Sequence, residues 1–187
     1  MSIRKQYDEA LSELNQALSE MGQAAADAIE NAMEALAATD AEAAAQIIKD
    51  DNQINEMEHD IEHRCMVLLL RQQPVAGDLR HISAALKVIT DFERIGDHAA
   101  DISEIMPHLF ASRKAGDPAI SEAIRMGQKA HKMVVDGLEA FLKEDMNAAQ
   151  KVIAADDEVD YDFNAIKRTL AEEIAADPAR WTPRWIC

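Results

Sequence analysis

The sequence is poor in aromatic residues, glycine, proline and cysteine. Of its 187 residues only 4% are aromatic, and there are six glycines, five prolines and two cysteines, whereas hydrophobic residues make up 48%. Few aromatic and turn-forming residues argue against a β-sandwich, and abundant Ala, Leu, Ile, Glu and Asp favour helices. Because a chain of this length can bury a sizeable core, we expect an all-α protein of one domain or two small ones.

Basic residues and long apolar runs are scarce too. Lys and Arg number 19 against 35 Asp and Glu, which gives a formal net charge of -16. Nucleic-acid phosphates and anionic lipids would repel such a surface. The longest apolar run, Met66 to Leu70, is far too short to span a bilayer, and the N-terminus has no signal-peptide pattern. We therefore expect a cytoplasmic protein with no nucleic-acid partner and no membrane insertion.

The two cysteines do not form a disulfide framework or a metal-binding pattern. Cys65 lies inside a helical pattern, where we expect it to be a small core residue. Cys187 is the last residue, and we expect it to be an exposed chain end.

Apolar residues recur at helical spacing in five long segments. Thr39 and Glu42 match a capping box before the second segment, and Asp117 with Pro118 matches the N-terminus of the fourth. The expected helices are a first over about 5–38, a second up to "RQQP" at 71–74, a third that contains 78–105, a fourth from 118 to about 142 and a fifth up to about 176.

The second half of the sequence repeats the first. "MGQ" at residues 21–23 recurs at 126–128, an offset of 126 − 21 = 105, and the register then continues without a gap. Matched positions include Asp40 and Asp145, Ile47 and Val152, Asp51 and Asp156, Ile54 and Val159, and Ile61 and Ile166. A helical hairpin has therefore been duplicated.

The same offset predicts that the second unit lacks its third helix. Adding 105 to 78–105 gives 183–210, whereas this sequence stops at 187 with "RWTPRWIC". A truncated or frame-shifted end and a naturally short protein are both open explanations. We divide the chain into a three-helix unit at 1–111, a linker at 112–117 and an incomplete unit at 118–187. An uncovered apolar face, with self-association or marginal stability, is the expected consequence.

A row of carboxylates marks one face of the third predicted helix. At about 100° per residue, Glu104, Asp97 and Asp101 lie within about 80° of Glu93, so we expect the row to point outward. The apolar stripe expected to pack inward consists of Phe92, Ile95, Ala99, Ile102 and Met106. A solvated face is the simplest interpretation. Neighbouring like charges repel, however, and a cation bound by Glu93, Asp97 and Asp101 would relieve that repulsion.

Two motifs together resemble the signature of the PhoU family. They are "QQPVAGDLR" at 72–80 and "DFERIGDHAADI" at 91–102. Members of this family are tandem three-helix bundles of long antiparallel helices, and the duplicated hairpin matches that plan through five of six helices. The resemblance therefore covers nearly the whole chain.

The resemblance implies a non-enzymatic, dimeric regulator of phosphate homeostasis. Such a protein contacts the ATPase subunit of the phosphate ABC transporter and a phosphate-sensing histidine kinase, and it represses the phosphate-starvation response when phosphate is plentiful. The transporter would place it at the inner membrane as a peripheral protein. The family's E/D-xxx-D motif falls on Glu93, Asp97 and Asp101, which implies a metal site for iron, zinc, nickel or manganese.

Other residues near these motifs have simpler structural interpretations. Asp78 is a favourable charge at a helix N-terminus, with Arg80 as its surface partner; a direct partner contact is the other possibility. Gly96 in mid-helix indicates close helix packing. We expect His98 to be exposed or hydrogen-bonded, although a ligand role beside Asp97 is the alternative.

A helical carboxylate metalloprotein, of the di-iron oxidase or metal-storage type, is the alternative function. Glu56 and His59 have the Glu-x-x-His spacing of such sites, but the similar pair Asp60 and His63 lies on the same predicted helix rather than a facing one. The sequence has no Gly-rich nucleotide loop and no recognisable catalytic triad. We therefore expect no enzymatic activity.

Overall fold

The computed structural model describes residues 3–72, 76–112 and 116–176, and in these ranges it contains helices and turns but no strand. The predicted all-α fold is thus confirmed. None of these helices combines the length and apolar character needed to cross a bilayer. The predicted end of the second helix at Pro74 and the predictions for "RWTPRWIC" lie outside the described residues. The helices are α1 (Ile3–Ala38), α2 (Ala41–Gln72), α3 (Ala76–Ser112), α4 (Pro118–Leu142) and α5 (Met146–Ala176).

Equivalent aspartates, Asp40 and Asp145, cap the N-termini of α2 and α5. One side-chain oxygen of Asp40 accepts hydrogen bonds from the backbone N–H groups two and three residues later, at 2.9 and 3.0 Å. Asp145 does the same at 2.9 and 3.0 Å. The predicted N-cap at Thr39 is wrong by one residue. Thr39 has a positive φ of 57°, whereas an N-cap residue typically has a β-region backbone. Glu144, the equivalent residue before α5, also has a positive φ, of 52°. Asp117 caps α4, as predicted.

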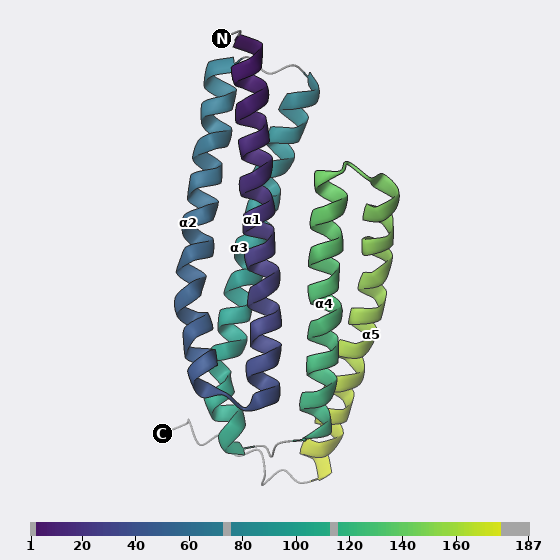
Figure 1. The fold of residues 1–187 in the computed structure, drawn as a ribbon. Helices are drawn as coiled ribbons and strands as arrows, with labels where there is room; N and C mark the ends of the chain where they lie inside the picture. The colour runs from purple at the N-terminus through teal and green to yellow at the C-terminus, as the bar shows by residue number, and fades with distance from the viewer. Residues whose placement is uncertain (1–2, 73–75, 113–115, 177–187) are drawn as a thin grey trace.

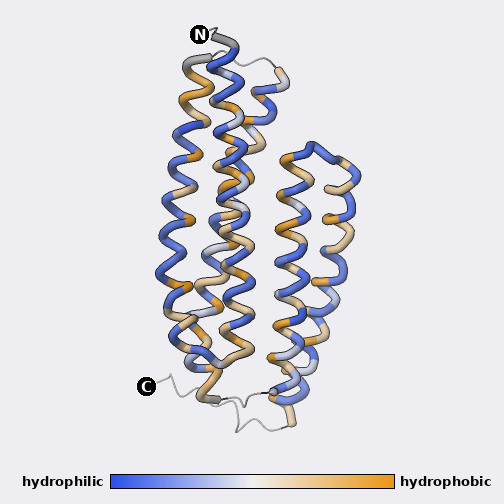
Figure 2. The backbone as a smooth tube through the Cα atoms, in the orientation of Figure 1, coloured by the Kyte–Doolittle hydropathy of each residue, from blue (hydrophilic) through white to orange (hydrophobic). Residues whose placement is uncertain are grey.

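The central helix of the fold is α1, which contacts α2, α3 and α4 (Figure 1). In addition α2 contacts α3, whereas α5 contacts α4 alone among the described helices. Successive helices run in opposite directions, and apolar positions recur along each of them (Figure 2). The first three helices therefore form a bundle, and the α4–α5 hairpin joins it through α1.

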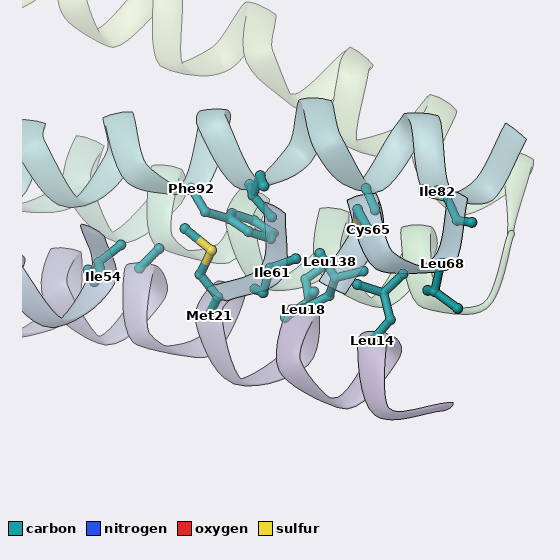
Figure 3. Packing of buried hydrophobic residues seen from close by; sticks show 13 residues of the cluster. Leu14, Leu18, Met21, Ile54, Ile61, Cys65, Leu68, Ile82, Phe92 and Leu138 are labelled. Atoms are coloured by element: carbon teal, nitrogen blue, oxygen red, sulfur yellow. The ribbon is translucent and has the colours of Figure 1, made fainter. Parts of the chain in front are cut away.

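The main core lies inside the three-helix bundle (Figure 3). Burial of each large side chain there stabilises the fold by about 1.5–3 kcal/mol. Cys65 is fully buried, as predicted, and burial raises the pKa of its thiol to about 11. The thiol is therefore protonated and unreactive at neutral pH. Core residues include Leu14, Leu18, Met21, Ile61, Ile82, Ile89 and, from α4, Leu138.

Two equivalent glycine contacts join α1 to α4. A Cβ atom at Gly22 would lie 2.9 Å from both methyl carbons of Leu138, and one at Gly127 would lie 2.2 Å from the sulfur of Met33. Gly22 and Gly127 are 105 residues apart, as are Met33 and Leu138. The repeat thus relates the two contacts, and each glycine lets the neighbouring helix approach closely.

Candidate functional site

The predicted acidic row lies on α3, and its first half faces α2. Glu93 and Asp97 are half-buried, whereas Asp101 and Glu104 are exposed. The expectation that the whole row points outward is therefore wrong for Glu93 and Asp97. The angular positions of residues on α3 do not show which other helices lie beside it. Here α2 packs against α3 and covers Glu93 and Asp97 in part.

Further carboxylates of this site come from α2, and the periodicity of the sequence does not identify them as part of it. Asp51 is half-buried, and Glu58 accepts a hydrogen bond from the Thr90 hydroxyl of α3 at 3.0 Å. The repeat gave one indication that position 51 matters, because the equivalent position of the second unit, Asp156, is also an aspartate. We define the α2–α3 acidic cluster as Asp51, Glu58, Glu93, Asp97 and Asp101.

Burial and mutual repulsion raise two pKa values in this cluster. Burial is the largest cause of the raised pKa of Asp51, followed by the charge of Asp97. Burial also raises the pKa of Glu93, followed by the charges of Asp97 and Glu58. The ionised forms of both carboxyls are therefore disfavoured, and a cation among them would be stabilising.

Gly96 allows α2 and α3 to meet closely at this cluster. A Cβ atom at Gly96 would lie 2.8 Å from the Ile54 side chain and 3.0 Å from Asp51 Oδ1, which confirms the packing role predicted for this glycine. Asp51 Oδ1 and Asn55 Oδ1 are buried without a hydrogen-bond partner, although Asn55 Nδ2 donates to Asp51 Oδ2 at 3.2 Å. Buried oxygens of this kind need a donor or a cation.

The donor types suit a hard or borderline cation, which prefers carboxylate and amide oxygens. In the residues that the structure describes, however, no three Asp, Glu, His or Cys side chains are grouped so that they could hold one ion. The side chains of the α2–α3 acidic cluster would have to adjust to close around a metal. Metal binding by Glu93, Asp97 and Asp101 stays a prediction.

The remaining residues near the motifs have structural surroundings. Asp78 is half-buried at the start of α3, and its charge is the second cause, after burial, of the raised pKa of Tyr7 on α1. Arg80 is exposed. His98 is exposed as well, with Nδ1 3.8 Å from Asp101 Oδ2. Asp78 therefore belongs to the junction between α1 and α3.

The alternative di-iron arrangement finds no support. Glu56, His59, Asp60 and His63 all lie on α2 and are all exposed. Asp60 forms an ion pair with Arg64 at 2.6 Å. A di-iron site needs inward-facing ligands from several helices, and these four side chains do not provide them.

Comparisons with known proteins identify the family. A model of the PhoU domain matches the chain twice, over residues 18–106 and 123–184. The PhoU homologue of Clostridium acetobutylicum, named a phosphate-specific transport system accessory protein, is 35% identical over 95% of this chain and 80% of its own length. A similarly named homologue from Aquifex aeolicus is 36% identical over 81% of this chain and 67% of its own.

Two solved structures have the same fold. The crystal structure of PhoU from Pseudomonas aeruginosa matches with a TM-score of 0.88 and 31% identity, and it covers 93% of this chain and 83% of that one. The regulatory PhoU protein from Streptococcus pneumoniae matches with a TM-score of 0.84 and 29% identity, over 91% of this chain and 80% of that one. The resemblance read from the two motifs is confirmed, and the chain belongs to the PhoU family.

Proposed function

We propose that the protein is a non-enzymatic accessory regulator of a phosphate-specific transport system. In this role it contacts the ATPase subunit of the phosphate ABC transporter and a phosphate-sensing histidine kinase. It represses the phosphate-starvation response while phosphate is plentiful. It works in the cytoplasm as a homodimer, peripheral to the inner membrane through the transporter.

The match of the PhoU model to both repeats carries this proposal. The relative from Clostridium acetobutylicum, 80% of whose length this chain covers, is named as an accessory protein of phosphate-specific transport. The physical properties agree with a role in protein contacts, because a net charge of -16 disfavours nucleic acid and anionic lipid. Long helices also offer extended surfaces to protein partners.

Deletion of the gene tests the regulatory role. Cells without it are expected to express phosphate-scavenging genes in phosphate-rich medium, and the returned gene is expected to restore repression. The purified chain, used as bait, is expected to recover the transporter ATPase subunit or the histidine kinase, whereas an unrelated acidic helical protein recovers neither. Normal repression in the deletion strain would contradict the proposal.

We also propose that Glu93, Asp97 and Asp101 hold a transition metal ion, with Asp51 as an additional ligand from α2. Iron, zinc, nickel and manganese are the candidate ions. The raised pKa values of Asp51 and Glu93 and the unpaired oxygen of Asp51 support the site. A bound cation would offset the repulsion and link α2 to α3.

Metal content and thermal unfolding test the site. The double variant Glu93→Gln with Asp97→Asn is expected to lose the metal and the rise in melting temperature that metal produces. Asp157→Asn with Glu172→Gln makes the same charge change on exposed positions of α5, and this control is expected to retain both. Equal metal content in the two variants would refute the assignment.

A further inference from the structure

A groove of about 420 Å³ lies between the two helices of the α4–α5 hairpin (Figure 1). Its floor consists of buried and half-buried apolar side chains, and its walls carry lysines and carboxylates. An apolar cavity of this size with a few polar groups is typical of a small-molecule site. We call it the α4–α5 groove; its floor is formed by Met133, Ala140, Ala148, Val152 and Ala155.

The α4–α5 groove lies on the side of α4 that faces away from α1. Leu138 packs into the main core, where it lies against Gly22 of α1. At about 100° per residue, the groove residues Lys129, Lys132 and Lys143 lie about 120–180° around α4 from Leu138. The groove is therefore separate from the junction of α1 and α4.

An equivalent groove, of about 300 Å³, lies between α1 and α2. Gly96 of α3 also lines it, so this groove stays open in a hairpin that packs against α3. The groove is therefore a feature of the repeated hairpin itself. The shared positions, each 105 residues before a residue that lines the α4–α5 groove, include Ala24, Asp27, Asn31, Ile47 and Gln53.

The two grooves differ in charge. Four of the nine lysines in the sequence line the α4–α5 groove, together with four carboxylates. The equivalent positions of the first hairpin carry four carboxylates and no basic residue. In a chain with a net charge of -16, the α4–α5 groove is thus selectively enriched in cations. The four residues are Lys129, Lys132, Lys143 and Lys151.

The end of the groove at the α4–α5 turn is suited to phosphate. Lys151 is exposed and forms no ion pair in the part of the chain that the structure describes. Lys143 pairs with Glu139, but both side chains are exposed, and such pairs are weak. Asp145 is already engaged, because it accepts hydrogen bonds from the backbone of α5. The positive end of the α5 dipole also favours an anion here.

The other end of the groove has a different character, because its lysines are already neutralised. Lys132 pairs with Asp136 at 2.6 Å. Lys129 lies 3.5 Å from Glu158 and 2.8 Å from Asp162. The carboxylates at this end can accept hydrogen bonds from hydroxyl or amino groups. The groove therefore fits a molecule with phosphate groups at one end and hydrogen-bond donors at the other.

We propose that the α4–α5 groove binds a nucleoside polyphosphate, with the phosphate chain between Lys143 and Lys151 and the nucleoside on the apolar floor towards Asp136 and Glu158. The net charge of the chain repels a polyanion, and the lysines of the groove offset that repulsion. The sequence has no Gly-rich nucleotide loop, so we expect binding without hydrolysis. The inference adds a ligand to the proposed regulator and does not depend on its protein partners.

Isothermal titration calorimetry with ATP tests the groove. EDTA is present, so that no metal ion links the phosphates to the α2–α3 acidic cluster. The wild-type chain is expected to bind one ATP with a Kd below about 1 mM. Lys143→Gln with Lys151→Gln is expected to weaken binding by at least about 10-fold. The control Lys49→Gln with Lys167→Gln removes the same charge outside the groove and is expected to leave binding unchanged.

Two parts of the ligand separate the contributions of phosphate and nucleoside. Adenosine and inorganic pyrophosphate are each expected to bind at least about 10-fold more weakly than ATP, because each fills only one end of the groove. Pyrophosphate that binds as tightly as ATP overturns the proposal, as does equal weakening in the two double variants. The absence of ATP binding up to about 1 mM overturns it too.

Lysine acetylation read by mass spectrometry gives a second measurement on the wild-type chain. ATP is expected to slow acetylation of Lys143 and Lys151 and to leave Lys49 unaffected, because only the first two would contact the phosphates. Equal acetylation rates of Lys143 and Lys151 with and without ATP overturn the proposed site.

Discussion

Equivalent positions of α2 and α5 are buried to very different depths. Ile61 is 1% exposed and Cys65 is 0% exposed, whereas Ile166 and Leu170, which follow them by 105 residues, are only half-buried. The whole of α5 contains no fully buried residue. Ile61 and Ile166 are the same residue, and Leu170 is larger than Cys65, so side-chain size does not explain the shallower burial on α5. The difference comes from their neighbours: α3 covers α2, whereas among the described helices α5 contacts α4 alone.

The comparison teaches that sequence periodicity creates an apolar face, and that a second element decides how deeply the face is buried. Ten large hydrophobic side chains are exposed among the described residues, and five of them lie on α5: Met146, Ile153, Tyr161, Phe163 and Ile174. Because local stability follows buried apolar contacts, we expect the α4–α5 hairpin to be the weaker part of this chain as a monomer.

The largest expected effect comes from truncation at matched positions. Ile61→Ala is expected to lower the free energy of unfolding by about 2–4 kcal/mol, because it leaves a cavity between three helices. Ile166→Ala is expected to cost less than about 1.5 kcal/mol, since its surroundings are half open to water. Urea unfolding followed by circular dichroism measures both. Equal losses of unfolding free energy would contradict the claim that α3 makes position 61 more important than position 166.

A smaller effect is expected at the contact that joins the two hairpins. In Gly127→Ala the new Cβ overlaps Met33, and the expected loss is about 1–3 kcal/mol. Gly77→Ala is the control, since its Cβ would meet nothing within 4 Å, and it is expected to be neutral or slightly stabilising. The same melting temperature for both variants would argue that the glycine is not needed between α1 and α4.

The smallest effect concerns pH and the matched pair Asp51 and Asp156. The pKa of Asp51 is raised in the folded chain, so its ionised form destabilises the fold. This penalty is complete above the folded pKa and disappears below the unfolded value near 4.

Asp51→Asn is therefore expected to raise stability at pH 7 by less than about 1 kcal/mol and to have no effect near pH 3.5. The exposed Asp156→Asn is the control and is expected to leave the pH dependence unchanged. Urea unfolding across this pH range, with a chelator present, makes the test. A loss of stability in Asp51→Asn at pH 7 would contradict the account.

The sequence predicted the five helices and their order well, because long periodic patterns and the caps are local signals. The cap at Asp40 rather than Thr39 was missed, because the choice depends on the backbone conformation of Thr39. The orientation of Glu93 and the exposure of Ile102, which is 37%, were missed for a different reason. Both depend on where the other helices lie around α3, and a single-helix pattern does not contain that information.

The candidate site divides in the same way. The α3 residues of the α2–α3 acidic cluster were identified, because their spacing within one helix is visible in the sequence. Asp51 and Glu58 were not, because they join the cluster only through the packing of α2 on α3. The only indication in the sequence that Asp51 matters was the aspartate at the equivalent repeat position, Asp156.

The most direct test of the central claim is native-state hydrogen exchange, resolved by helix. The account predicts that α2 amides exchange only through global unfolding, whereas α5 amides exchange through opening of the hairpin while α1, α2 and α3 remain protected. Equal protection of α2 and α5 would contradict the claim that the covering helix, rather than the repeated sequence, determines the stability of each unit.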